Sequence, residues 1–250
     1  MVYLHGKFVW FEHMSHDLEA ARRFYGELLG WKSDPAPIGN GQYHMIMNGT
    51  EGIGGFRIAM PGMPSHWMSY LSVADVDAAA AAALEAGGKL LMPPTDFSPV
   101  GIAATIADPQ GAVFSVWKDA QGDREDRRPI AMGDWYWNEL TTTDDQAAAA
   151  FYETVFGYAR EEMDMGPQGI YTILVKDGIQ RAGLMKHPQP GTPPAWTPYL
   201  RVPDCDAAAT KASSLGAQVC VPPTDIPEVG RFAFLLDPTG APVGIMRGDI

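Results

Sequence analysis

The sequence predicts an α+β protein made of two similar domains, and two observations support this prediction: an internal repeat and a regular order of strand and helix signals. The chain has 250 residues, of which 46% are hydrophobic. This length and apolar content suffice for two ordinary hydrophobic cores. The repeat indicates that the two cores belong to copies of one architecture.

The repeat keeps its register over most of the chain. Three pairs of segments match: DLEAARRFYGELLGW (17–31) with DDQAAAAFYETVFGY (144–158), PPTDFSPVG (93–101) with PPTDIPEVG (222–230), and ADPQGAVFSV (107–116) with LDPTGAPVGI (236–245). The offset is 127 residues for the first pair and 129 for the other two. We therefore predict domains at 1–120 and 134–250, joined by a charged linker at 121–133.

The first half begins with signals for one strand, one helix and further strands. FVWFEHM (8–14) alternates as a strand does. Asp17 is placed to cap a helix that ends at Gly30. YHMIM (43–47) and GGFRIAM (54–60) are predicted to follow as strands.

The same order of signals recurs three more times. In the first half a strand at 67–73 precedes a helix that is capped by Asp75 or Asp77 and ends at Gly87-Gly88. Strands at 101–107 and 112–118 follow, joined by the turn Asp108-Pro109-Gln110-Gly111. The second half has helices near 144–156 and 204–215 and the turn Asp237-Pro238-Thr239-Gly240. Each half therefore consists of two modules.

Composition excludes several classes of partner. The net charge of -12 and the pI near 4.8 argue against binding to nucleic acid or to an anionic membrane. No stretch approaches 18 uninterrupted apolar residues, and the N-terminal sequence lacks the pattern of an export signal. We expect a cytoplasmic protein. Cys205 and Cys220 are predicted to be reduced, structural thiols.

The modules, the helix ends FYGELLGW and FYETVFGY, and the DPQG and DPTG turns together resemble the vicinal oxygen chelate superfamily of glyoxalases, bleomycin resistance proteins and extradiol dioxygenases. The resemblance covers 1–118 and 134–248. It implies paired βαβββ modules whose mixed sheets curl into cups. It also implies that a cup binds a metal ion or a small ligand.

The resemblance further implies where metal ligands would stand, on the first and last strands of the modules. The residues at those places are Trp10, Trp137, Met68, Thr197, Ser115 and Gly244. An indole cannot bind a divalent ion, so no metal cofactor is predicted. A divalent metal remains the alternative, and it requires a shifted register that brings in His13 or His44. Otherwise the histidines are expected to be solvated or at sheet edges.

The face of the first strand that the resemblance turns into the cup carries a Trp-x-Glu pair in both halves. In the first half the pair is Trp10 and Glu12, and in the second half it is Trp137 and Glu139. A carboxyl group on an aromatic wall is suited to proton transfer, so both glutamates are candidate catalytic residues. The alternative is that each glutamate only hydrogen-bonds backbone or an arginine.

Matched aromatic residues predict a cup that suits a flat or apolar organic molecule. Tyr70 matches Tyr199, and Trp67 matches Trp196. Arg57 is placed to anchor an anionic group or to pair with a glutamate. The predicted ligand-binding residues are Trp10, Arg57, Met68, Tyr70, Trp137 and Tyr199.

Three functions remain open at this point. The first is a metal-independent protein that binds a small aromatic or apolar molecule, like the antibiotic-sequestering members of the superfamily. The second is a lyase, isomerase or dioxygenase of the superfamily, with a divalent metal at unrecognised ligands or with the glutamates as acid–base groups. The third is a scaffold or regulatory protein whose cups are filled by side chains. The chain is expected to be a monomer with internal pseudo-symmetry or a homodimer.

Overall fold

The computed structural model describes residues 1–36, 43–166 and 169–248. The elements of the first half are β1 (Phe8–Ser15), α1 (Leu18–Leu29), β2 (Lys32–Ala36), β3 (Tyr43–Asn48), β4 (Glu51–Ile58), β5 (His66–Ser72), α2 (Val76–Glu85), β6 (Lys89–Asp96), β7 (Gly101–Ala107) and β8 (Val113–Asp119). Those of the second half are β9 (Trp135–Thr142), α3 (Asp145–Phe156), β10 (Ala159–Asp164), β11 (Ile170–Lys176), β12 (Ile179–Lys186), β13 (Ala195–Arg201), α4 (Cys205–Ser214), β14 (Gln218–Ile226), β15 (Gly230–Leu236) and β16 (Pro242–Gly248).

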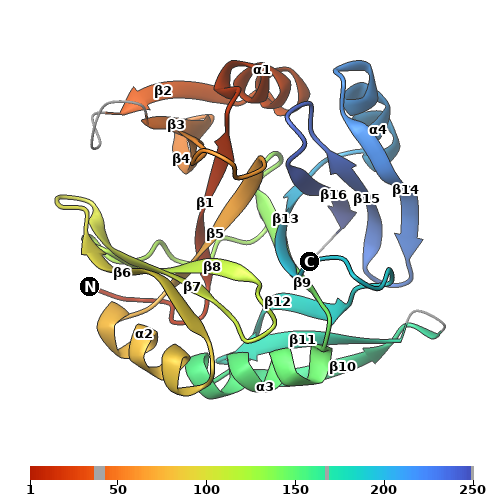
Figure 1. Ribbon diagram of the computed structural model, residues 1–250. Coiled ribbons are helices and arrows are strands. Elements are labelled where there is room, and N and C mark those ends of the chain that lie inside the picture. The colour runs from red at the N-terminus through yellow and green to blue at the C-terminus, as the bar shows by residue number, and fades with distance from the viewer. Residues whose placement is uncertain (37–42, 167–168, 249–250) are drawn as a thin grey trace. The chain divides into compact units, whose positions relative to one another are not determined.

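The predicted fold class is confirmed: four βαβββ modules supply two eight-stranded mixed sheets (Figure 1). The strand order is β2-β3-β4-β1-β5-β8-β7-β6 in one sheet and β10-β11-β12-β9-β13-β16-β15-β14 in the other. Parallel pairs such as β1 with β4 occur next to antiparallel pairs such as β3 with β4. Each module therefore places its first strand beside its last one.

The four helices of the described residues begin in the same way, with an aspartate side chain that accepts a hydrogen bond from a backbone N–H in the first turn. These N-cap residues are Asp17, Asp75, Asp144 and Asp204. Gly30 and Gly157 end α1 and α3 in the left-handed conformation that glycine adopts most easily. The sequence signals for helix ends were therefore reliable.

The strand signals of the first half gave no residue range for its outermost strands, β2 and β6, whose counterparts in the other sheet are β10 and β14. Three of them contain proline, at Pro35, at Pro93-Pro94 and at Pro222-Pro223. Proline cannot donate a backbone hydrogen bond, and a strand at the edge of a sheet tolerates this because one side lacks a partner. β10 is rich in charged residues instead, which also suits an edge.

The chain divides into two compact units that draw on both halves of the sequence. The first unit comprises Met1–Val9, Ser69–Glu125 and Trp137–Trp196. The second comprises Trp10–Met68, Asp126–Tyr136 and Thr197–Ile250. Within the first unit α2 contacts α3, and within the second unit α1 contacts α4.

Aromatic side chains dominate the core of each unit. In the second unit Trp67 packs edge to face on Tyr25 and Trp135. In the first unit Trp196 packs on Tyr152 in the same manner. Both Trp67 and Trp196 are 4% exposed. The expectation that these two tryptophans line a cup was therefore wrong, because they face the helices and fill the core.

The two cysteines are free thiols, as expected. Burial raises the pKa of the Cys205 thiol to about 11, so this thiol stays protonated near neutral pH. No helix in the described part of the chain is long and apolar enough to cross a membrane.

Candidate functional site

Three of the predicted site residues of the first half come together on one face of β1. The indole N–H of Trp10 donates a hydrogen bond of 2.8 Å to the hydroxyl of Tyr43, on β3. The same hydroxyl is hydrogen-bonded to the carboxylate of Glu12. Arg57, on β4, places its guanidinium 3.9 Å from Glu12 Oε2. We call these four residues the Trp10 cluster.

The electrostatics of the Trp10 cluster fix the direction of its hydrogen bonds. Burial, followed by the negative charge of Glu12, raises the pKa of Tyr43 well above its usual value. Tyr43 therefore keeps its proton, accepts from Trp10 and donates to Glu12. The glutamate is only 6% exposed, whereas the side chain of Arg57 is 51% exposed.

A glycine makes this arrangement possible. Gly55 on β4 pairs with Glu12 on β1, and a Cβ at this position would collide with the Tyr43 hydroxyl. The tyrosine ring can therefore lie across the sheet only because position 55 has no side chain.

The first unit contains a second copy of this chain of hydrogen bonds. Trp137 donates a hydrogen bond of 2.8 Å to the Tyr171 hydroxyl, which is hydrogen-bonded to Glu139. Burial, then the charge of Glu139, raises the pKa of Tyr171 well above its usual value. Gly183 corresponds to Gly55, since a Cβ at position 183 would collide with Tyr171. We call Trp137, Tyr171 and Glu139 the Trp137 cluster.

The two clusters differ at the arginine. In the parallel β1–β4 ladder Arg57 on β4 pairs with Met14 on β1. In the matching β9–β12 ladder the residue that corresponds to Arg57 is Met185 on β12, which pairs with Thr141 on β9. A methionine therefore stands where the Trp10 cluster has its guanidinium. The Trp10 cluster can attract an anionic group, whereas the same position in the Trp137 cluster offers only an apolar side chain.

The remaining predicted ligand residues lie in other surroundings. Met68 is buried, at 6% exposure. Tyr70 packs edge to face on Trp117, with 6.3 Å between ring centroids. Tyr199 lies against Gly244 and near Phe232. Trp10 and Trp137 are partly exposed, so they are the aromatic residues of this set that offer the most accessible surface.

The side chains at the places implied for metal ligands do not fit a divalent ion. Two are indoles whose N–H groups already donate to tyrosines, and the others include a thioether and a glycine. Within residues 1–36, 43–166 and 169–248, no three His, Cys, Asp or Glu side chains gather as a metal site requires. His13 and His44 therefore belong to no such group in these ranges.

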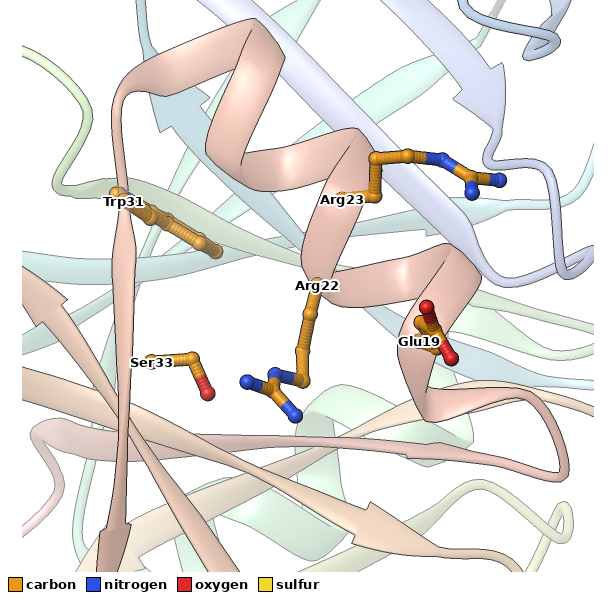
Figure 2. Close-up of a pocket in the computed structure, with 5 residues that line it drawn as sticks. All are labelled: Glu19, Arg22, Arg23, Trp31 and Ser33. Atoms are coloured by element: carbon orange, nitrogen blue, oxygen red, sulfur yellow. The ribbon is translucent and has the colours of Figure 1, made fainter.

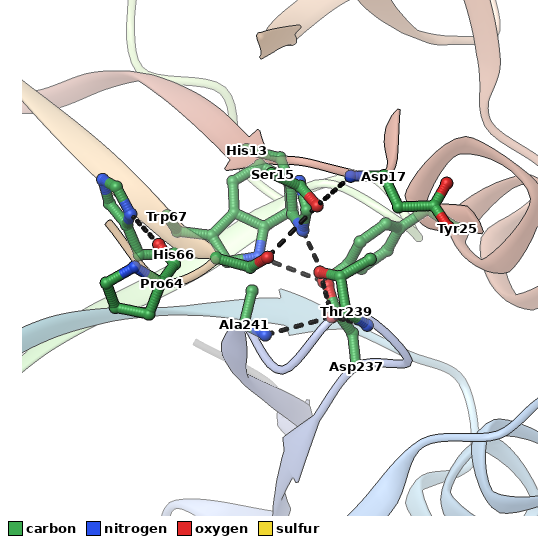
Figure 3. A network of polar contacts seen from close by, with 11 residues as sticks. His13, Ser15, Asp17, Tyr25, Pro64, His66, Trp67, Asp237, Thr239 and Ala241 are labelled. Carbon is green, nitrogen blue, oxygen red and sulfur yellow. Dashed lines mark hydrogen bonds and ion pairs between the residues drawn. The ribbon is translucent and has the colours of Figure 1, made fainter. Parts of the chain in front are cut away.

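His13 is instead part of a buried network that sequence reasoning missed. Its Nε2 lies 2.7 Å from Asp237 Oδ2, and both side chains are fully buried. Tyr25 donates to the same carboxylate oxygen at 3.0 Å, and Trp67 donates to the Tyr25 hydroxyl at 3.1 Å. Figure 3 shows these side chains gathered around the aspartate of the DPTG turn. His13 is therefore neither solvated nor at a sheet edge.

The first unit repeats this network without a histidine. Tyr152 donates to Asp108 Oδ2 at 3.1 Å, and Trp196 donates to the Tyr152 hydroxyl at 2.8 Å. Leu140 occupies the place that corresponds to His13. The DPxG turns thus join a helix to a sheet in each unit, and only the second unit adds an ionisable partner.

Tyr43 and Tyr171 are the site residues that sequence reasoning missed. A signal was available, because the two tyrosines are 128 residues apart, as are Gly55 and Gly183, which make room for them. The Trp-x-Glu pairs alone do not show which neighbour joins indole to carboxylate.

Four βαβββ modules with two mixed sheets define a tandem protein of the vicinal oxygen chelate fold. Residues 10–117 match the model of a glyoxalase-like domain, and residues 136–245 match the model of the glyoxalase/bleomycin resistance protein/dioxygenase superfamily. The chain is 37% identical over 246 residues to the protein CFP32 of Mycobacterium tuberculosis, whose name includes the word glyoxylase. This match spans 95% of the chain and 93% of the relative. The chain belongs to the glyoxalase/bleomycin resistance protein/dioxygenase superfamily.

Another relative has a name from antibiotic biosynthesis. The anthracycline biosynthesis protein DnrV of Streptomyces peucetius is 32% identical over 262 residues, which covers 95% of this chain and 92% of the relative. Among solved structures, the Mn(II)-bound glyoxalase from Novosphingobium aromaticivorans has a TM-score of 0.69 and 16% identity, covering 98% of this chain and 83% of that one. The 2,3-dioxygenase LapB from Pseudomonas has a TM-score of 0.67 and 13% identity, covering 99% and 94%. These two likenesses show the fold alone.

Proposed function

We propose that this chain binds a small aromatic organic molecule through its Trp10 and Trp137 clusters, without a resident metal ion. The observation that carries the proposal is the repeated chain of hydrogen bonds from tryptophan through tyrosine to glutamate. The chain of hydrogen bonds holds each indole in one orientation, while each tryptophan remains partly exposed. A fixed, accessible ring suits stacking against a flat ligand, because little rotamer freedom is lost on binding.

Arg57 gives the Trp10 cluster a preference among aromatic ligands. Its side chain is half exposed, and its ion pair with Glu12 is long, at 3.9 Å, so the guanidinium can turn toward an anionic substituent at the surface. The relationship to DnrV supports a fused-ring aromatic ligand, since anthracyclines are compounds of that class. We therefore expect the Trp10 cluster to favour a flat aromatic molecule that carries a negative charge.

Native mass spectrometry of the purified, untagged chain is the first test. An organic adduct on a metal-free chain supports the proposal, and a stoichiometric divalent ion contradicts it. Binding is then measured by calorimetry with an anthraquinone sulfonate as the probe. Trp10→Ala is expected to weaken this binding about tenfold, because a stacked ring contributes about 1 to 3 kcal/mol.

Arg57→Met is the matched variant, since it gives the first cluster the residue of the second. It should weaken binding of the anthraquinone sulfonate several-fold and leave binding of a neutral anthraquinone unchanged. Equal losses for both probes would show that Arg57 supports the fold rather than recognises charge.

A second candidate is a lyase, isomerase or dioxygenase activity of the same superfamily. The observation that favours it is the likeness in fold to a Mn(II)-bound glyoxalase. The residues present do not fit that metal, so the glutamates would have to carry proton transfer. Glu12→Gln and Glu139→Gln should then abolish turnover of a methylglyoxal–thiol adduct and leave the fold intact. Turnover that depends on added Mn²⁺ in both variants would reject the acid–base role and restore a metal mechanism.

A further inference from the structure

A hollow of about 390 Å³ lies in the second unit, between α1 and β2. It is lined by Glu19, Arg22, Arg23, Trp31 and Ser33. Figure 2 shows the guanidinium of Arg22 reaching from the helix toward the Ser33 hydroxyl, while Arg23 points away. The hollow is separate from the Trp10 cluster, whose residues do not line it.

Polar groups in and beside this hollow are buried without partners. Arg22 Nε and Ser33 Oγ are both inaccessible to water, and neither makes a hydrogen bond with any described residue. The same is true of Nδ1 of His44, on β3. Burial and the nearby positive charge of Arg22 lower the pKa of His44, so its imidazole adds no second cation near neutral pH. A buried donor that lacks an acceptor is costly, so such a group marks a place for a ligand.

The matching place in the first unit shows what the hollow lacks. Arg160 stands on β10 where Ser33 stands on β2, and its guanidinium donates to both oxygens of Glu153, at 2.6 and 2.7 Å. It also donates to Gln146 at 2.9 Å. The counterpart of Glu153 in α1 is Gly26, so the second unit has no carboxylate at this position of the helix.

We propose that the hollow between α1 and β2 binds a small molecule with a carboxylate group, which takes the place that Glu153 occupies in the first unit. Both residues are partly exposed, so on binding their side chains rotate and bring Arg22 Nε and the Ser33 hydroxyl to the carboxylate oxygens, to which they donate. A planar guanidinium can hold a carboxylate through two parallel N–H groups that meet its two oxygens, and Arg160 holds Glu153 in this way in the first unit. The lining residues include two arginines and one glutamate, and because Arg23 points away, Arg22 supplies the positive charge that meets the ligand.

The binding is measured by following the Arg22 Nε–H signal in a ¹H–¹⁵N spectrum of the full chain while sodium benzoate is added at constant ionic strength. Sodium chloride serves as the salt control, and inorganic phosphate as the competing oxyanion. We expect benzoate to shift the Arg22 signal in a saturable manner and chloride to leave it in place. Phosphate that binds as tightly as benzoate would overturn the assignment to a carboxylate.

Arg22→Lys and Arg23→Lys form a matched pair of variants, read by benzoate-induced shifts of the backbone amides around Ser33. Arg22→Lys removes the Nε donor and keeps the charge, so benzoate affinity should fall about tenfold or more. Arg23→Lys should change the affinity less than about threefold, since Arg23 points away from Ser33. Equal effects of the two substitutions would contradict a fork-shaped carboxylate site.

Gly26→Glu tests the comparison with Glu153 directly. The new carboxylate should occupy Arg22, abolish benzoate binding and raise the melting temperature. A Cβ at Gly26 comes within 3.3 Å of the Trp31 carbonyl, so Gly26→Ala is the control for backbone crowding. If Gly26→Glu folds as Gly26→Ala does and still binds benzoate like the wild-type chain, the proposal fails.

Discussion

The aspartates of the two DPxG turns stand at matched positions in the two units, yet their surroundings push their acidities in opposite directions. Burial raises the pKa of Asp108 above its usual value, and hydrogen bonds from backbone amides and Tyr152 offset only part of this effect. Burial acts in the same sense on Asp237, but the hydrogen bond and charge of His13 outweigh it, so the pKa of Asp237 lies below its usual value. The main cause of the difference is the histidine in place of leucine on the neighbouring strand, and the hydroxyl of Thr239, which donates to Asp237 Oδ1 at 2.7 Å, adds to it.

The comparison teaches that a duplicated scaffold can keep its geometry while its electrostatics diverge. Both carboxylates bind the amides of their own turn and one tyrosine from a helix. The first unit holds its carboxylate with backbone amides and a tyrosine, whereas the second adds the hydroxyl of Thr239 and an ionisable ring, that of His13. The two networks should therefore contribute differently to the stability of the fold, and substitutions in each network measure the difference.

Removal of the carboxylate should have the largest effect. Asp237→Ala is expected to lower the free energy of unfolding by about 3 to 5 kcal/mol, because His13 and Tyr25 lose their shared acceptor at a fully buried site. Asp108→Ala should cost about 1 to 3 kcal/mol, since only one side-chain donor, from Tyr152, is left unpaired. Urea unfolding of both variants at neutral pH measures the difference. Equal losses would mean that His13 adds nothing to the network.

When the tyrosine hydroxyls are removed instead, the first unit should lose more stability than the second, which is the reverse of the order expected for the aspartates. Tyr152→Phe is expected to cost about 1.5 to 3 kcal/mol, because Asp108 Oδ2 then has no side-chain donor. Tyr25→Phe should cost only about 0.5 to 1.5 kcal/mol, since His13 still contacts Asp237. Thermal unfolding followed by circular dichroism compares the two variants. A larger loss for Tyr25→Phe would show that the histidine does not compensate.

His13→Leu converts the second network into a copy of the first. The pKa of Asp237 should move from below its usual value to above it, with a loss of about 1 to 2 kcal/mol in stability. Carbon-detected NMR of the aspartate carboxyl groups during a pH titration gives the pKa. If it stays low in the variant, the turn amides rather than His13 are responsible.

The pH dependence of stability should carry the smallest effects, with opposite signs. Asp237 has a lowered pKa when folded, so its contribution is complete above its usual pKa of about 3.9 and is lost as the pH falls through the folded value. Asp108 has a raised pKa when folded, so its contribution is complete below the usual pKa and is lost as the pH rises through the folded value.

Asp237→Asn and Asp108→Asn isolate these two contributions. The difference in unfolding free energy between wild type and variant should grow with rising pH for Asp237→Asn and shrink for Asp108→Asn, by about 1.4 kcal/mol for each unit of pKa shift. Denaturation across the acid range measures both curves. Two curves with the same sign would contradict the comparison.

The sequence predicted the parts of the fold that depend on local chemistry. Aspartate caps and glycine ends gave the helices within a residue or two, and the repeat gave the modules. The residue ranges of the edge strands were not predicted, because proline and charged residues suppress the usual strand signal. Only the pairing with the neighbouring strand shows that Pro35 lies in a sheet. Local signals describe an element well when its own residues determine it.

The candidate site was predicted in part for the same reason. Alternation along β1 placed Trp10 and Glu12 on one face, but the tyrosine that joins them comes from a strand two positions away in the sheet. The contact between His13 and Asp237 spans 224 residues of sequence. No local pattern encodes such a partner, so the histidine looked isolated until the fold was known.

The composition of the compact units has a consequence for synthesis on the ribosome. Each unit needs segments from both halves of the chain, since α1 packs with α4 and α2 packs with α3. Neither unit can be complete while only the first half has emerged. The sides of α1 and α2 that contact α4 and α3 stay uncovered until those helices are translated. The nascent first half should therefore depend on chaperones, and folding should be completed only after release of the last module.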